Sequence, residues 1–184
     1  MAFEVRGGGM KGAASHVSHE QAAKLFNDAI AYVTKSDKAM NVYETLNRLP
    51  DKIAVFTFIG AEDHYMPKLG GGPYIEWDPL SSLKVTSSGW QSPAVAVIHE
   101  MFHAYQDLIL KDIFLVNGGF PEKTVRGFAG NQELVPKCEI PTVAFEAQVC
   151  EQLARFGHTN ETKRTSYIRC LDTVQVKSVT GTGR

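Results

Sequence analysis

Apolar residues recur at three- and four-residue steps in four segments of this chain, a spacing that predicts four amphipathic helices. Several residues typical of helix ends flank these segments. Ser18 with Gln21 forms a capping box, Ser92 and Pro93 suit an N-cap and a first helical position, and Gly157 suits a C-cap. The predicted helices cover about residues 18–35, 37–48, 94–110 and 141–156.

Two shorter segments carry the pattern of β-strands. Residues 52–59, Lys-Ile-Ala-Val-Phe-Thr-Phe-Ile, are rich in β-branched and aromatic side chains and end at Gly60. Residues 74–77 follow a glycine-rich loop and form a second predicted strand, whereas residues 117–137 are expected to be mostly irregular. Two or three strands with four or more helices predict an α+β fold.

The glycine-rich stretch at the start of the sequence suggests a domain boundary. A chain of 184 residues fits one domain with a substantial core. Residues 6–15, Arg-Gly-Gly-Gly-Met-Lys-Gly-Ala-Ala-Ser, have the composition of a flexible linker. We therefore expect residues 1–15 to be a flexible leader or a junction to an upstream protein, and residues 16–184 to be the folded domain. An ordinary frayed terminus would explain the same composition.

Composition and charge argue against several classes of function. The formal net charge is -1, so no basic excess indicates binding to nucleic acid or to an anionic membrane surface. No apolar run approaches the length of a membrane span, and the first residues lack the pattern of a signal peptide. We therefore expect a globular domain with no nucleic-acid partner and no membrane span.

The third predicted helix contains the motif His99-Glu100-Met101-Phe102-His103, which has the form H-E-x-x-H. On a helix, His99 and His103 lie one turn apart on the same face, where two neutral imidazoles can bind one Zn²⁺ ion. Glu100 lies beside them and can take a proton from a metal-bound water. The motif therefore predicts a zincin-like domain that binds one zinc ion and uses Glu100 as a general base.

A catalytic zinc site of this type needs a third protein ligand. The metzincin pattern requires Gly and His three and six residues after His103, but Gln106 and Ile109 stand there. A glutamate on a later segment is the remaining choice. The later glutamates are Glu133, Glu139, Glu146 and Glu151. We expect Glu146 because it lies inside a predicted helix that can hold it rigidly, with Glu139, near the start of that helix, as the alternative.

The predicted strand Tyr74-Ile75-Glu76-Trp77 has two possible roles. In zinc peptidases an edge strand often borders the cleft and pairs with an extended substrate through its free backbone groups. These four residues are therefore candidates for substrate binding. An ordinary strand within a meander explains the same pattern.

Several short segments together resemble the NleD-like zinc metallopeptidase effectors of bacterial secretion systems. These segments are His-Glu-Met-Phe-His-Ala-Tyr-Gln at 99–106, Gly-Gly-Pro-Tyr-Ile-Glu-Trp-Asp-Pro at 71–79, Phe-Glu at 145–146 and Arg-Thr-Ser-Tyr at 164–167. The resemblance is strongest to the metallopeptidase toxin domains at the C-termini of VgrG spike proteins of type VI secretion. One departure is visible, because Ala147 and Gln152 stand where the family pattern has Asn after a glutamate.

The resemblance implies a function, a location and two further site residues. Such families resemble the clostridial neurotoxin light chains around the metal, where an Arg-x-x-Tyr pair assists the oxyanion; Arg164 and Tyr167 have that spacing. By this resemblance the protein is a secreted zinc endopeptidase. It would act on a protein or peptide in a target cell, in a bacterial periplasm or in a host. An upstream spike domain and an immunity protein are the implied partners.

Two other functions fit the same residues. A zinc amidase that acts on cell-wall peptides would use the same motif, because the motif does not distinguish one amide from another. A binding module with a structural or inactive zinc site is the third possibility. The presence of Glu100 argues against the binding module, because a structural site needs no general base.

Overall fold

The four predicted helices are present in the computed structural model of the chain. They are α1 (His19–Val33), α2 (Asp37–Asn47), α3 (Pro93–Leu108) and α5 (Glu139–Arg155). The structure describes residues 2–8, 17–60, 62–67, 72–85, 89–111, 122–126, 132–136, 138–158, 160–164 and 172–183. In 122–126, in 132–136 and at residue 172, only the backbone is described.

The helix ends follow the sequence pattern closely. The Ser18 hydroxyl accepts a hydrogen bond from the backbone N–H of Gln21 at 3.2 Å, which caps α1 as predicted. Pro93 occupies the first turn of α3, and Gly157 follows α5 with φ +85°, a conformation that favours glycine. α5 begins two residues before Pro141, so Glu139 lies on the helix itself.

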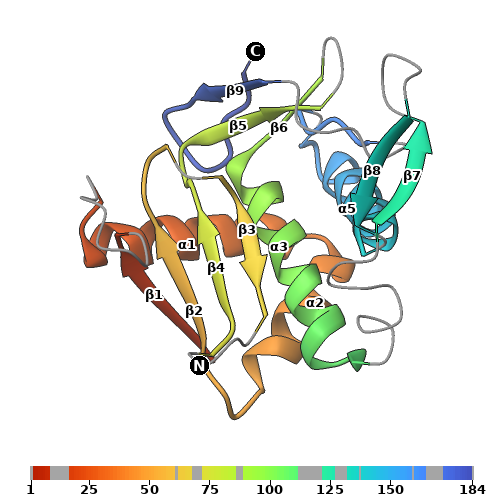
Figure 1. Cartoon of the computed structure of the whole chain (residues 1–184). Helices are drawn as coiled ribbons and strands as arrows, with labels where there is room; N and C mark the ends of the chain where they lie inside the picture. The colour runs from red at the N-terminus through yellow and green to blue at the C-terminus, as the bar shows by residue number, and fades with distance from the viewer. Residues whose placement is uncertain are drawn as a thin grey trace.

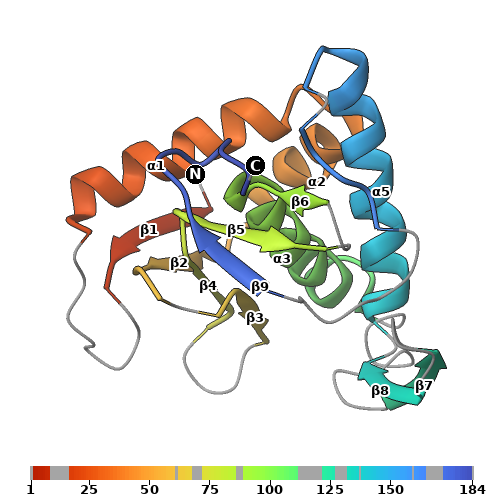
Figure 2. The same cartoon turned by 90° about the horizontal axis from the view of Figure 1, so that it is seen from above.

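The main sheet has four strands in the order β1-β2-β4-β3. β1 (Phe3–Gly7), β2 (Ile53–Thr57) and β4 (Tyr74–Trp77) are parallel, and β3 (His64–Met66) runs antiparallel to β4 at the edge. Alternate residues such as Ile53, Val55, Ile75 and Trp77 are buried, as expected for a sheet with one face in the core. Figure 2 shows α1 running along this sheet, with α3 and then α5 to the right of it.

Two predictions for the sheet are wrong. Residues 3–7 pair with β2, so this part of the expected leader belongs to the folded domain; residues 9–15 lie outside the described part of the chain. The strand 74–77 is present, but the interpretation of it as an edge strand is wrong, because it pairs with β2 on one side and β3 on the other. Its backbone groups are therefore engaged in the sheet.

Two smaller sheets complete the described structure. One has the order β6-β5-β9 and consists of β5 (Ser81–Lys84), β6 (Trp90–Gln91) and β9 (Asp172–Gln175). The other is a hairpin of β7 (Glu122–Arg126) and β8 (Gln132–Pro136), which lies near the start of α5 (Figure 1). The prediction that residues 117–137 are mostly irregular is therefore wrong for the ten residues of these two strands.

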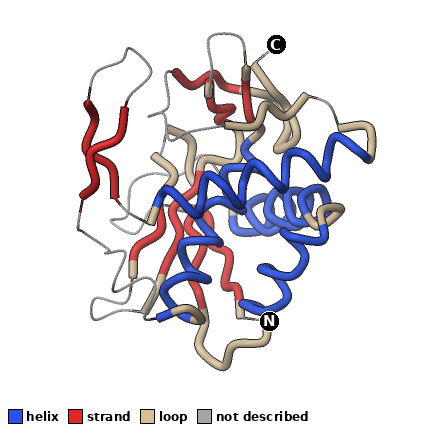
Figure 3. The backbone as a smooth tube through the Cα atoms, turned by 90° about the vertical axis from the view of Figure 1, so that its right-hand side faces the viewer, coloured by secondary structure: helices blue, strands red, loops and turns tan. Residues whose placement is uncertain are grey.

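Helix α3 is the centre of the domain. It packs against α1, α2 and α5, and against β3, β4 and β5. Figure 3 shows the helices grouped together beside the strands of the main sheet. Because neighbours cover α3 on most sides, the side chains of its motif are held in a buried environment. None of the described helices has the length and hydropathy needed to cross a bilayer.

Candidate metal centre

The H-E-x-x-H motif lies in the middle of α3, and the start of this helix is fixed by a carboxylate. Ser92 occupies the N-cap position but makes no side-chain cap of its own. Instead, Glu161 accepts hydrogen bonds from the Ser92 backbone N–H at 2.9 Å and from its hydroxyl at 2.6 Å. The same carboxylate accepts a bond from the Tyr32 hydroxyl at 2.8 Å, and burial raises its pKa. A negative group at a helix N-terminus stabilises the helix that carries the motif.

The two motif histidines and Glu139 form one compact group. The imidazole rings of His99 and His103 have centroids 5.0 Å apart, as expected one turn apart on a helix. Their Nε2 atoms lie 3.3 Å and 3.2 Å from the two carboxylate oxygens of Glu139. One ligand atom from each of the three residues lies within 4.8 Å of the other two. Among the described residues, this group has the composition and spacing of a metal site.

Glu146, the expected third ligand, lies on the other side of His99. Its Oε2 atom is 2.9 Å from Nδ1 of His99, and its carboxylate also binds Arg164 and the side-chain amide of Gln91. The geometry therefore favours the alternative, Glu139, as the third ligand. Both glutamates are on α5, but Glu139 is at its first position and faces Nε2, whereas Glu146 is two turns later and is engaged with a buried guanidinium.

The Nδ1 atom of His103 faces Thr142 on α5. The Thr142 hydroxyl oxygen lies 3.4 Å from Nδ1 and donates its own proton to the Cys138 carbonyl at 2.8 Å. Each motif histidine thus has a polar partner at Nδ1 and directs Nε2 at the Glu139 carboxylate. When a metal ion is bound, a partner that accepts from Nδ1 keeps the ring proton there and leaves the Nε2 lone pair for the metal.

These residues could hold a divalent metal ion, and their donor atoms are among those that zinc accepts. Zinc prefers imidazole nitrogen and carboxylate oxygen, and catalytic sites use three protein ligands with a fourth position open. The Oε2 atom of Glu139 is buried, makes no hydrogen bond, and lies 3.3 Å from Nε2 of His99. A buried carboxylate oxygen needs a positive neighbour, which the protonated imidazole provides here and a metal ion could provide in its place. The donor set His99, His103 and Glu139 therefore suits a divalent metal.

The charges of the group are strongly coupled. Burial lowers the pKa of His99, but its close contacts with the Glu139 and Glu146 carboxylates outweigh burial and raise that pKa to about 10. Burial raises the pKa of both glutamates, and their cationic and imidazole neighbours outweigh it: the pKa of Glu139 is lowered, and that of Glu146 is lowered to about 2. A metal ion would replace the proton on Nε2 as the positive charge among these carboxylates.

Glu100 and Asp63 place two more carboxyl groups near the histidines. Glu100 is 8% exposed and follows His99 on α3. Asp63 immediately precedes β3, and its Oδ1 atom accepts a hydrogen bond from the Asp78 backbone N–H at 2.7 Å. Burial, together with the charges of Glu100 and Asp78, raises the pKa of Asp63 well above its usual range, whereas His99 lowers it. A second carboxyl group, that of Asp63, therefore lies close enough to Glu100 and His99 for their charges to affect one another.

Among the other predicted site residues that the structure describes, Arg164 contacts the edge of the His–Glu group, whereas the strand 74–77 lies in the main sheet. Arg164 is 7% exposed and contacts Glu146 and the Nδ1 atom of His99. Ile75 and Trp77 are in the core, with the Trp77 indole donating to the Pro93 carbonyl at 2.9 Å. The side chains of Tyr74 and Glu76 alternate with these two and are only partly buried. Tyr167 lies outside the described part of the chain.

Five residues that support this centre were not identified from the sequence as site residues. They are Asp63, Gln91, Gln106, Thr142 and Glu161. Helical spacing could have indicated two of them, because Gln106 lies three residues after His103 and Thr142 three residues after Glu139. The others come from distant segments, and only the tertiary fold brings them to α3.

Comparison of the chain with protein-family models, with curated proteins and with solved structures finds no match. The geometry of the His–Glu group is therefore the basis on which a function can be proposed.

Proposed function

We propose that this protein is a zinc-dependent endopeptidase. The observation that supports the proposal is the convergence of the Nε2 atoms of His99 and His103 on the Glu139 carboxylate, with Glu100 next in sequence to one of these ligands. A purely structural zinc site has four protein ligands and needs no base. Among the described residues the group provides three ligands and a neighbouring carboxylate, which is the composition of a hydrolytic site.

Each residue has a defined role in this proposal. A zinc ion held by the three ligands would lower the pKa of water and polarise the scissile carbonyl. Glu100 accepts a proton from the attacking water and later donates it to the leaving amine, so that the carboxylate is regenerated. Glu146 orients the His99 ring through Nδ1, and Arg164 in turn holds Glu146. Arg164 is therefore assigned to positioning rather than to direct contact with the oxyanion.

The edge strand β3 is the proposed binding surface for an extended peptide, in place of the strand 74–77. Among the described strands, β3 pairs only with β4. Its Tyr65 hydroxyl donates to Asp107 of α3 at 2.6 Å, so the strand is held alongside the helix that carries the motif. A peptide that adds to this edge would run beside α3, and its backbone would bond to the strand.

The proposed biological setting is delivery into a target cell by a secretion system. This part of the proposal rests on the resemblance to NleD-like effectors and to the toxin domains of VgrG spike proteins, described above on residues 71–79, 99–106, 145–146 and 164–167. An upstream spike domain and an immunity protein are its expected partners. Toxicity on production in a bacterial periplasm or in a host cell, lost in Glu100→Gln, would support this setting. Toxicity that the variant retains would contradict it.

The catalytic proposal is tested with zinc-loaded wild type and Glu100→Gln on a peptide library, with peptide products identified by mass spectrometry. The proposal predicts cleavage by wild type, loss of activity of at least about 10²-fold in the variant, and full zinc content in both proteins. Equal cleavage by both would remove Glu100 from the mechanism.

Purified peptidoglycan serves as a second substrate. Release of muropeptides without cleavage of any peptide in the library would favour the cell-wall amidase over the endopeptidase.

A further inference from the structure

A single buried hydroxyl joins the two helices that carry the metal ligands. Thr142 of α5 is fully buried, and its Oγ1 atom lies at the meeting point of three polar groups. It donates to the Cys138 carbonyl at 2.8 Å, accepts from the Gln106 side-chain amide at 2.6 Å, and lies 3.4 Å from Nδ1 of His103. Two of these groups are on α3, and the third directly precedes Glu139.

Counting donors and acceptors fixes the direction of each bond. A threonine hydroxyl has one proton to donate and can accept two hydrogen bonds. The proton goes to the Cys138 carbonyl, which can only accept, so Gln106 and His103 act as donors towards the oxygen. The hydroxyl therefore favours a proton on Nδ1 of His103, so that a metal ion would be bound through Nε2, the atom directed at Glu139.

Gln106 holds this arrangement from the α3 side. Its side chain is 1% exposed, and its amide nitrogen lies within reach of both the Thr142 hydroxyl and the Cys138 carbonyl, at 2.6 Å and 3.4 Å. In this orientation its Oε1 atom is buried without a partner. An unsatisfied buried oxygen lowers the stability of the fold. The hydrogen bonds of the amide nitrogen to Thr142 and Cys138 offset this loss.

We propose that Thr142 and Gln106 are positioning residues that set the orientation of His103 and the distance between His103 and Glu139. The inference rests on the proposed metal centre and adds two residues to it. The hydroxyl acts on both sides of the centre: it holds one ligand through Nδ1, and it ties down the carbonyl next to the other ligand. Neither residue is expected to touch the metal or the substrate.

The test compares Thr142→Val, which keeps the shape but removes the hydroxyl, with Thr142→Ser, which keeps the hydroxyl. The readouts are the Zn²⁺ dissociation constant from competition with a chromophoric chelator, and the visible spectrum of the cobalt-loaded protein. We expect Thr142→Val to bind Zn²⁺ about 10- to 100-fold more weakly than wild type, the range typical of lost partners of metal ligands, and to show an altered cobalt spectrum. Thr142→Ser should restore both readouts.

The matched control is Thr57→Val in β2. Thr57 is also fully buried, and its hydroxyl donates to the Arg6 carbonyl at 3.1 Å, on the main sheet. This substitution removes the same hydroxyl in a similar environment and should leave the zinc dissociation constant unchanged. A general loss of stability would affect both valine variants, whereas loss of positioning affects only Thr142→Val.

A second variant keeps the test decisive if Thr142→Val does not fold. Gln106→Met removes the amide donor with little change in length, and we expect weaker zinc binding in the same direction. Zinc binding as tight as wild type in the folded Thr142 or Gln106 variants would overturn this inference and leave the proposed function standing. Failure of wild type itself to bind Zn²⁺ would overturn both.

Discussion

The Nδ1 atom of His99 lies 2.9 Å from Oε2 of Glu146, while Nε2 of the same ring lies 3.3 Å from Glu139. One imidazole thus joins two carboxylates with different roles. The carboxylate at Nδ1 is buried with Arg164 and orients the ring, and the carboxylate at Nε2 lies where a metal would be bound. This arrangement explains how two glutamates of one helix can both serve the site.

The Glu146–Arg164 pair should be coupled in its effect on stability. Removing the carboxylate in Glu146→Ala leaves a buried guanidinium without this partner, which we expect to cost on the order of 3 kcal/mol in the free energy of unfolding. Arg164→Ala should have a similar effect. Urea denaturation of both single variants and the double variant measures the coupling energy. We expect the double variant to lose less than the sum of the two single variants; strictly additive losses would show that the pair does not act as a unit.

Arg164→Lys should not restore the free energy of unfolding that Arg164→Ala loses. The guanidinium contacts Glu146 through both Nε and Nη2, and a lysine ammonium cannot reproduce this two-point contact. The same urea denaturation applies, with the zinc dissociation constant as a second readout. A lysine variant with wild-type stability and zinc affinity would show that charge alone is needed at this position.

Because the pKa of Asp63 is raised, we expect Asp63→Asn to increase the stability of the metal-free protein by an amount that depends on pH. The unfolded carboxyl ionises above about pH 4, whereas burial and the charge of Glu100 keep the folded one protonated to higher pH. The folded state then binds more protons than the unfolded state, so this group lowers stability as pH rises through that window. Asparagine cannot ionise and retains an oxygen to accept the Asp78 N–H bond.

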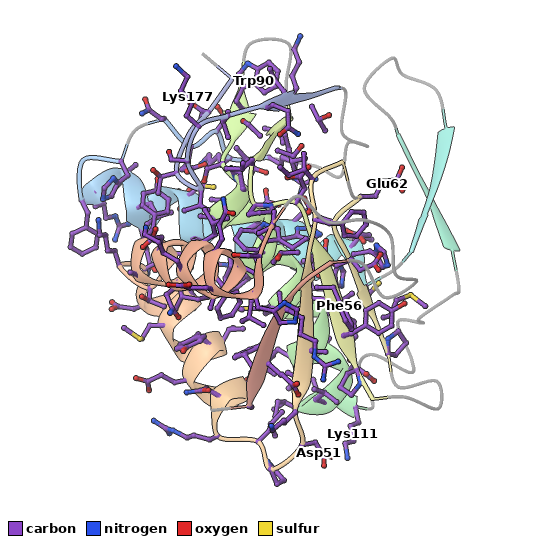
Figure 4. All side chains as sticks on the ribbon, turned by 90° about the vertical axis from the view of Figure 1, so that its left-hand side faces the viewer. Asp51, Phe56, Glu62, Trp90, Lys111 and Lys177 are labelled. Atoms are coloured by element: carbon purple, nitrogen blue, oxygen red, sulfur yellow. The ribbon has the colours of Figure 1, made fainter. Side chains whose placement is uncertain are left out.

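We therefore expect Asp63→Asn to stabilise the chelator-treated protein by on the order of 1 kcal/mol at pH 7 to 8, equivalent to about 2–4 °C in Tm, and to have little effect below pH 4. Thermal melts across this pH range measure the difference. Asp51→Asn, in the exposed turn between α2 and β2 (Figure 4), is the control. A gain that is the same at every pH would contradict the explanation.

The hydrogen bonds of Glu161 join Tyr32 of α1 to Ser92 at the start of α3, and removing the Tyr32 hydroxyl measures how much this connection stabilises the fold. Tyr32→Phe removes the 2.8 Å hydrogen bond to the buried Glu161, and we expect a loss of about 1–2 kcal/mol in the free energy of unfolding. Tyr43→Phe is the control, because the Tyr43 ring stacks on Phe3 with an interplanar angle of 7° and the substitution keeps that ring contact. Equal losses in both variants would mean that the Tyr32 hydroxyl contributes nothing specific.

The sequence was sufficient to predict the helices. The spacing of apolar residues around His99, Glu100 and His103 depends on local periodicity, and α3 confirms the helix that carries them; His99 and His103 also lie together in the group that could hold a metal ion. The strands at 53–57 and 74–77 were also predicted, from β-branched and aromatic residues, and the mix of helices and strands predicted the α+β class. The other strands of the described structure were not predicted, among them those at 3–7, 122–126 and 132–136. Taken together, residues 122–126 and 132–136 are mostly polar or charged, which carries little strand preference, and residues 3–7 lie directly before a glycine-rich stretch; all three segments form strands by pairing with other strands.

The choice between Glu139 and Glu146 shows where local reasoning fails. Both glutamates are on one helix, and rigidity favoured the one inside it. The deciding factor is the buried Arg164, which comes from a segment after the helix and binds Glu146. The position of such a partner depends on tertiary packing, which helical periodicity does not specify. The same limitation applies to the edge strand, because strand order in a sheet is a property of the whole fold.

The most direct test of the central claim is the zinc content of wild type, Glu139→Gln and Glu146→Gln, measured by elemental analysis after reconstitution and removal of excess metal. If His99, His103 and Glu139 hold the metal, wild type contains about one zinc per chain, Glu139→Gln contains little or none, and Glu146→Gln retains its zinc with weaker affinity. Zinc retained by Glu139→Gln and lost from Glu146→Gln would reverse the assignment of the third ligand. Absence of zinc from reconstituted wild type would contradict the metal centre altogether.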